Sequence, residues 1–259
     1  MCLHPLQITR PTYTGGVRQY IVPCGKCSEC LQKLRNEVAA LACLEGVDKQ
    51  SLSFMTMTYR QSELPISRIR AEEFLDKDTG ELLYVWKSIC VERGSSCYDW
   101  QLESFKNKCE VQTDDDGDCI CPTLYREDWK AHMKRFRRSL ERSGLSKDFS
   151  MLSFGEYGDR RHRPHYHAMF FGLSAQAEKI FTELWEKYYG ECKTISVPRF
   201  NEDGSDAFMK VSKYISKYIS KGSHLPDACK QGFIEKPRRL SSVRFGRKDL
   251  NVEKLRSFI

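Results

Sequence analysis

Apolar residues recur at helical spacing in several stretches of the chain. Leu31, Leu34, Val38 and Leu41 share one face of a segment that begins near Ser28 and stops at Gly46, which predicts a helix over 28–45. The same spacing predicts a helix over 126–142 that ends near Gly144, a helix from a Ser174 cap to Gly190, and another from about Ser205 to Gly222.

Other stretches alternate apolar and polar residues, as half-buried strands do. Residues 54–59, Met151 to Glu156 and Tyr166 to Gly172 have this pattern, and a basic loop over 158–164 joins the last two. Strands mixed with helices outside a strict β-α-β order predict an α+β fold, with a central antiparallel sheet and flanking helices.

The stretch from about 76 to 122 interrupts these patterns. It is polar, with an acidic run over 114–118 and five cysteines, Cys90, Cys97, Cys109, Cys119 and Cys121. We interpret it as a cysteine-rich insertion. The expected organisation is an N-terminal cysteine motif and helix (1–50), a central domain with this insertion (51–225), and a basic C-terminal tail (226–259).

Composition narrows the class of protein. The chain has 259 residues, 40% of them hydrophobic, and 42 Lys and Arg against 35 Asp and Glu. The net charge of +7 suits a polyanionic partner. We expect no membrane span, because apolar runs such as Val38 to Leu44 are far shorter than the roughly 20 residues that a bilayer requires.

Compartment follows from the N-terminal sequence and the cysteines. The chain begins without a basic segment followed by an apolar one, so we expect no secretory signal and a protein that stays where it is made. Twelve cysteines in such a protein are typical of buried thiols or metal ligands rather than disulfides.

Two histidines in one predicted strand, His165 and His167, are the most informative pair in the chain. Alternate residues of a strand point to the same face, about 6.5–7 Å apart. Glu156, near the end of the preceding predicted strand, would lie beside them if the two strands paired antiparallel. Two imidazoles and a carboxylate can hold a divalent cation with open positions for water or phosphate oxygen. The alternative is two surface histidines at a sheet edge.

A repeat of tyrosine and lysine marks the helix predicted over 205–222. Phe208, Val211, Ile215 and Ile219 form its buried stripe, and at about 100° per residue one flank carries Tyr214, Tyr218, Lys217 and Lys221. Ammonium groups favour phenolate and neutralise a phosphate transition state, so this flank suits tyrosine attack on a phosphodiester. The alternative is an amphipathic helix with solvated lysines.

Cys24, Cys27 and Cys30 are spaced as in a zinc knuckle, with Cys2, His4 or Cys43 as a fourth ligand. Reduced buried thiols explain the spacing equally well. A second zinc site from Cys97, Cys109, Cys119 and Cys121 is a weaker hypothesis, because their spacing is irregular.

Taken in order, these motifs resemble the HUH superfamily of replication initiators, in particular those of small single-stranded DNA phages, the gokushovirus-like microviruses. The matching segments are Val22-Pro-Cys-Gly-Lys-Cys-Ser-Glu-Cys30, Phe54-Met-Thr-Met-Thr-Tyr59, Phe154-Gly-Glu-Tyr-Gly158, Arg163-Pro-His-Tyr-His167 and the tyrosine–lysine repeat at 214–221. The resemblance covers roughly residues 20–222. The insertion at 76–122 has no counterpart in it.

The resemblance implies a metal-dependent nickase for origin DNA with an HUH-like fold. Such enzymes cut one strand, keep a 5′-phosphotyrosine link, leave a 3′-hydroxyl that primes rolling-circle synthesis, and later rejoin the strand. Carried over to this chain, Glu156, His165 and His167 would bind Mg²⁺ or Mn²⁺, Tyr214 and Tyr218 would be nucleophiles, and Lys217 and Lys221 would position phosphate.

Partners and surroundings follow from the same resemblance. The substrate would be single-stranded DNA at a replication origin, in the host bacterial cytoplasm if a phage encodes the chain. The sequence has no phosphate-binding loop of an NTPase, so unwinding and synthesis would need a host helicase and polymerase.

Basic residues outside the motifs are candidate DNA contacts. Arg160, Arg161 and Arg163 adjoin the predicted metal ligands, Lys134 and Arg138 belong to the basic face of the helix over 126–142, and the tail adds 236–239 and 247–248. Solvated helix faces are the simpler explanation of the last two groups.

Two other functions fit the same residues. A plasmid relaxase or a single-strand transposase uses the same tyrosine chemistry. A non-catalytic, zinc-stabilised DNA-binding protein would carry the histidine pair by coincidence.

Overall fold

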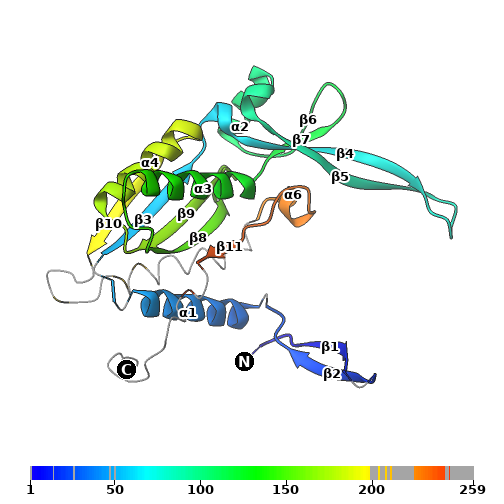
Figure 1. Ribbon diagram of the computed structural model, residues 1–259. Coiled ribbons are helices and arrows are strands. Elements are labelled where there is room, and N and C mark those ends of the chain that lie inside the picture. Colours follow the sequence, from blue (N-terminus) through cyan, green and yellow to red (C-terminus); the bar gives the residue numbers. More distant parts are fainter. Residues whose placement is uncertain are drawn as a thin grey trace.

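The protein is described here from a computed structural model. It describes residues 2–13, 15–25, 27–46, 48–49, 51–198, 204, 208, 211, 225–242 and 245. The predicted α+β fold is confirmed: antiparallel sheets are flanked by helices (Figure 1).

The main sheet has five strands in the order β10-β3-β9-β8-β11, and every neighbouring pair is antiparallel. Its strands are β3 (Ser51–Thr58), β8 (Ser150–Tyr157), β9 (Pro164–Phe171), β10 (Cys192–Pro198) and β11 (Arg239–Ser241). Strand β11 lies within the stretch expected to be a basic tail, so part of that tail is an edge strand of the sheet.

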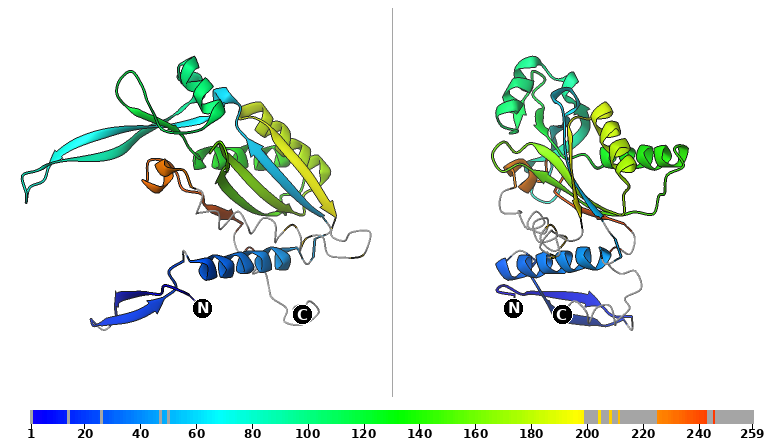
Figure 2. Two further views of the ribbon diagram at one scale, coloured as in Figure 1. Left: turned by 180° about the vertical axis from the view of Figure 1, so that it is seen from behind. Right: turned by 90° about the vertical axis from the view of Figure 1, so that its left-hand side faces the viewer.

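Helices α3 (Arg126–Arg142) and α4 (Ala175–Tyr188) cover one face of this sheet (Figure 2). Their apolar stripes, including Trp129, Phe136, Phe181 and Trp185, pack on the strand residues of that face, such as Met57 and Phe170. The predicted cap of α4 is confirmed, because the Ser174 hydroxyl accepts a hydrogen bond from the backbone N–H of Ala177.

Helix α1 (Ser28–Glu45) contributes to the core on the other face. Val38 and Ala42 belong to a cluster there with Leu52, Met169 and Phe171, since alternate strand residues point to opposite faces. The predicted bounds of α1 are confirmed, but Ser28 is its first residue and Cys27 its N-cap.

Residues 76–122 build most of a second antiparallel sheet, in the order β5-β4-β7-β6. Its strands are β4 (Pro65–Leu75), β5 (Leu82–Arg93), β6 (Gln112–Thr113) and β7 (Cys119–Pro122), with α2 (Asp99–Asn107) between β5 and β6. The acidic run is held in place, because Arg68 pairs with Asp114 and Asp118, and Arg70 pairs with Asp118.

The N-terminal segment forms a separate hairpin of β1 (Leu6–Pro11) and β2 (Val17–Val22) near the start of α1 (Figure 1). A short helix, α6 (Asp227–Lys230), precedes β11. Among the described residues, no helix combines the length and the apolarity needed to cross a membrane.

Candidate active site

The β8–β9 hairpin brings Glu156, His165 and His167 together. The predicted antiparallel pairing of these strands is confirmed, and its register sets Glu156 opposite His165 and Phe154 opposite His167. Directly opposed residues point to the same face of a sheet, as do residues two apart in one strand. The three side chains therefore converge on the face where α1 packs.

The ligand atoms of this triad lie within 4.8 Å of one another. Glu156 Oε2 lies 3.6 Å from His165 Nε2 and 3.3 Å from His167 Nε2. The side chains of Glu156 and His167 are nearly buried, whereas that of His165 is 17% exposed. The site is thus built into the sheet and opens towards solvent beside His165.

The other ring nitrogen of each histidine already has a partner. Nδ1 of His167 lies 3.1 Å from the Thr56 hydroxyl, and Nδ1 of His165 lies 3.0 Å from the Arg163 carbonyl oxygen. The Arg163 carbonyl can only accept, so His165 carries its proton on Nδ1 when neutral and turns the lone pair of Nε2 towards Glu156.

Strand β3 supplies the support that sequence reasoning missed. Thr56 pairs in register with His167, and the Phe54 ring stacks on that imidazole with centroids 5.6 Å apart. Alternation along 54–59 shows that Phe54 and Thr56 share a face, but it does not show which strand lies next to β3. Partners that orient metal-binding imidazoles in this way are usual at protein metal sites.

The donor set fits a divalent cation. Two imidazole nitrogens with fixed orientation and one carboxylate are ligands that Mn²⁺ accepts readily, while Mg²⁺ favours the carboxylate and water. The residues expected to hold the metal are therefore assembled, and their second partners are in place.

The three arginines of the β8–β9 loop differ from one another. Arg160 and Arg161 are exposed. Arg163 is directed elsewhere: its guanidinium donates to the Tyr59 carbonyl oxygen at 2.7 Å and to Gln61 Oε1 at 2.8 Å. Burial lowers the pKa of this guanidinium. Arg163 thus fastens the loop to the chain after β3, while the first two remain the better candidates for DNA contact.

Lys134 and Arg138 are exposed on α3, which covers the opposite face of the main sheet from the triad. They line a groove of about 490 Å³ with three further basic residues of α3, Arg126, Lys130 and Arg137. The structure does not bring them into the site of Glu156, because the sheet lies between.

The predicted nucleophiles Tyr214 and Tyr218, and the lysines Lys217 and Lys221, lie outside the described residues. Two members of the buried stripe predicted for their helix are described. Phe208 is buried against Phe171, and Val211 packs on the same cluster, which includes Met169 of β9. This cluster is on the face of the sheet that carries the triad.

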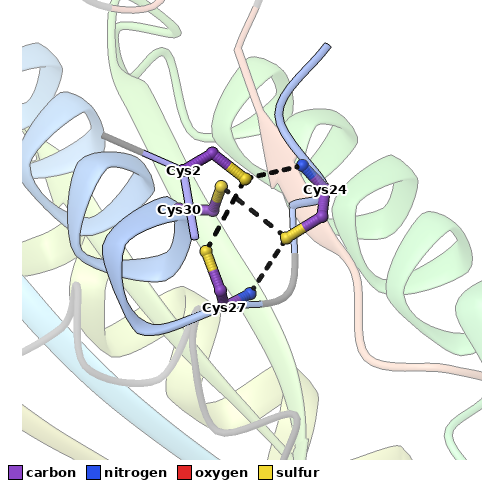
Figure 3. A group of neighbouring side chains, drawn as sticks. All are labelled: Cys2, Cys24, Cys27 and Cys30. Atoms are coloured by element: carbon purple, nitrogen blue, oxygen red, sulfur yellow. Dashed lines mark hydrogen bonds between the residues drawn. The ribbon is translucent and has the colours of Figure 1, made fainter. Parts of the chain in front are cut away.

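A second group of ligand atoms lies at the start of α1. The sulfur atoms of Cys2, Cys24, Cys27 and Cys30 all lie within 4.8 Å of one another (Figure 3). Cys2 is therefore the fourth member of the motif. Cys43, 13 residues beyond Cys30 in the same helix, is about 20 Å away along the helix axis.

The cysteines of the second sheet form no such group within the described residues. Cys109 and Cys121 are buried in the core, and desolvation raises the pKa of each thiol to about 12. The weaker hypothesis of a second zinc site is wrong, because these side chains pack as apolar groups.

Comparison with known proteins gives two matches. A family model of replication-associated proteins, described by the ORF2 protein, matches residues 113–223. The replication-associated protein ORF4 of Chlamydia phage 1 is 25% identical over 169 residues, 65% of this chain. The resemblance to phage replication initiators is confirmed.

The extent of both matches is limited. The aligned region is 27% of the length of the Chlamydia phage protein, and no solved structure matches the chain. The segment that the family model matches contains the triad and the tyrosine–lysine repeat, whereas the four clustered cysteines lie outside it.

Proposed function

We propose that this chain initiates phage DNA replication by nicking single-stranded origin DNA, through metal-dependent transesterification to a tyrosine. The observation that carries the proposal is the convergence of Glu156, His165 and His167 within 4.8 Å, inside a segment that matches a replication-associated family. A phage relative that is named as a replication-associated protein supports the setting.

Glu156, His165 and His167 would hold the Mg²⁺ or Mn²⁺ ion. When bound, such an ion withdraws charge from a phosphodiester oxygen. Thr56 and the Arg163 carbonyl keep the imidazoles oriented through Nδ1, so little reorganisation is needed when ligands bind.

The proposed nucleophile is Tyr214 or Tyr218. Its phenolate oxygen forms a bond to phosphorus while the bond from phosphorus to the 3′-oxygen breaks. The 3′-oxygen takes up a proton and leaves as a hydroxyl, and the 5′ end stays as phosphotyrosine. Lys217 and Lys221 favour the phenolate and balance charge on the phosphate. Because one phosphoester replaces another, the reverse reaction can rejoin the strand.

The position of Phe208 and Val211 supports this pairing of tyrosines and triad. Both pack on the triad face of the sheet, and the sequence predicts that the tyrosine flank adjoins their stripe. The proposed reaction produces a primer terminus only, so a host helicase and polymerase would complete replication.

The test uses full-length protein with labelled single-stranded oligonucleotides that tile the genome encoding the chain. With Mn²⁺ we expect a covalent adduct on denaturing gels, and none with EDTA. Tyr214→Phe combined with Tyr218→Phe should lower adduct formation by at least about a thousandfold, with DNA affinity retained. Glu156→Gln combined with His167→Ala should remove the dependence on Mn²⁺.

Tyr13→Phe is the matched control, because Tyr13 is fully exposed in the N-terminal hairpin. Undiminished adduct in the double tyrosine variant would refute the nucleophile assignment. Binding of DNA without adduct under every metal condition would favour a non-catalytic DNA-binding protein. An adduct that forms only on plasmid transfer or transposon-end sequences would favour a relaxase or a transposase.

A further inference from the structure

The N-terminal hairpin has almost no core of its own. Nearly every residue of β1 and β2 is exposed, including the apolar side chains of Leu6, Val17 and Ile21. A two-stranded hairpin without packing is only marginally stable in water. Its attachment to α1 therefore needs another source of stability.

The four clustered cysteines lie where the hairpin meets the helix. Cys2 precedes β1, Cys24 follows β2, Cys27 is the N-cap of α1, and Cys30 is in its first turn. The strands close at their base through the pair Leu6 and Val22. A bond among these cysteines would thus hold both ends of the hairpin against the start of the helix.

Local backbone geometry also favours sulfur ligands. The N–H groups of Cys24 and Cys27 point at the sulfur atoms of Cys2 and Cys24, each at 3.3 Å (Figure 3). Gly25 has φ of 72°, a conformation that suits glycine and lets the chain turn between Cys24 and Cys27. The side chain of Cys27 makes no capping bond, although N-cap residues usually do.

The sulfur separations match a tetrahedral metal site. Four sulfur atoms at about 2.3 Å from a zinc ion lie about 3.8 Å from one another. The observed separations are 3.8 Å for Cys2 and Cys27 and 4.0 Å for Cys24 and Cys30. A disulfide needs about 2.05 Å, and all four cysteines are free thiols.

We propose that Cys2, Cys24, Cys27 and Cys30 bind one structural zinc ion that fastens the β1–β2 hairpin to the start of α1. Four protein ligands close the coordination shell, so the site stabilises structure and leaves no position for substrate. Charge agrees: a zinc tetrathiolate carries −2, it lies at the positive end of a helix, and residues 1–28 contain no Asp or Glu.

The first measurement is the zinc content of full-length protein purified under reducing conditions. We expect one zinc per chain in a variant with His165→Ala and His167→Ala, where the triad can no longer bind the metal. Adding Cys27→Ser to that variant should remove the zinc. Adding Cys90→Ser instead should leave it, because Cys90 is exposed on β5 and far from the cluster in sequence. This outcome does not depend on whether the chain cleaves DNA.

The second measurement replaces zinc with Co²⁺ in the chain that keeps all four cysteines, so it does not rely on a variant that folds. The visible spectrum of a tetrahedral cobalt tetrathiolate should appear with one equivalent. Hydrogen exchange should show protected amides in β1 and β2 that lose protection when a chelator is added, while β8 and β9 keep theirs. Absence of zinc and of the cobalt spectrum, disulfides found by mass, or an equal zinc loss in the Cys90→Ser variant would overturn the proposal.

Discussion

The histidine of α3, His132, shows how burial alone decides the behaviour of a residue. It is fully buried between Phe181 and Trp185, and neither ring nitrogen has a hydrogen-bond partner among the described residues. Desolvation lowers its pKa to about 3. The neutral imidazole therefore serves as an aromatic core residue, unlike His165 and His167, whose ring nitrogens are all directed at polar atoms.

This burial predicts a dependence of stability on pH. Between about pH 6.5 and pH 3 the unfolded chain binds a proton at His132 that the folded chain does not, so the free energy of unfolding falls as the pH falls. His132→Leu should remove about 1 kcal/mol of the loss between pH 5.5 and pH 4.5. Urea unfolding of both proteins at the two pH values measures it.

His4→Leu serves as the control, because His4 is exposed near the N-terminus and should leave the pH dependence unchanged. Equal slopes for His132→Leu and the original chain would mean that His132 is protonated, or solvated, in the folded protein.

Helix α3 carries two functions on its two sides. Its apolar stripe completes the core, and its outer side forms the basic groove lined by Lys134 and Arg138. A row of cations beside an apolar floor suits the backbone of a nucleic acid. Because the main sheet separates this groove from the triad, it can add affinity for DNA without touching the reacting phosphate.

We expect Lys134→Ala with Arg138→Ala to weaken binding of single-stranded DNA whatever its sequence. The slope of log affinity against log salt should become shallower by about 1.4, about 0.7 for each lost phosphate contact. The fraction of bound DNA that forms adduct should not change. Fluorescence anisotropy over a range of salt concentrations measures the slope.

Lys179→Ala with Lys187→Ala provides the comparison, since both lysines are exposed on α4 outside the groove. If this pair reduces affinity as much as the α3 pair does, the effect is one of net charge and the groove has no special role.

At the scale of the whole molecule, one ionic contact joins the two sheets. The Asp128 carboxylate at the start of α3 is 4% exposed and accepts bonds from Arg93 at 2.6 and 2.8 Å and from the Tyr59 hydroxyl at 3.0 Å. Arg93 ends β5, and Tyr59 follows β3. The second sheet is thereby tied to the body that carries the triad.

Arg93→Ala should lower the free energy of unfolding by about 3 kcal/mol, because it leaves a buried carboxylate without its cation. Arg93→Met with Asp128→Leu should recover part of that loss, since apolar groups of similar size replace the ions. Denaturant unfolding of the three proteins gives both numbers.

The exposed pair of Lys87 and Glu72 on the second sheet is the reference. Lys87→Ala should cost less than about 1 kcal/mol, since solvent screens such a pair. A similar small cost for Arg93→Ala would show that the two sheets are held together by apolar packing alone.

Local pattern was enough to predict much of this protein. The bounds of α1, the strand alternation that puts His165 and His167 on one face, and the amphipathic face of α3 follow from periodicities of a few residues, which backbone geometry sets. The pairing of Glu156 with His165 was also predictable, because a short loop between two strands favours an antiparallel hairpin.

Only the tertiary structure decided which distant segments meet. It chose Cys2, 22 residues before Cys24, as the fourth cysteine, set β3 beside β9 so that Thr56 reaches His167, and turned Arg163 towards Tyr59 and Gln61. It also put α3 across the sheet from the triad. Such contacts depend on how whole elements bury their apolar faces against one another, and no short-range periodicity records that choice.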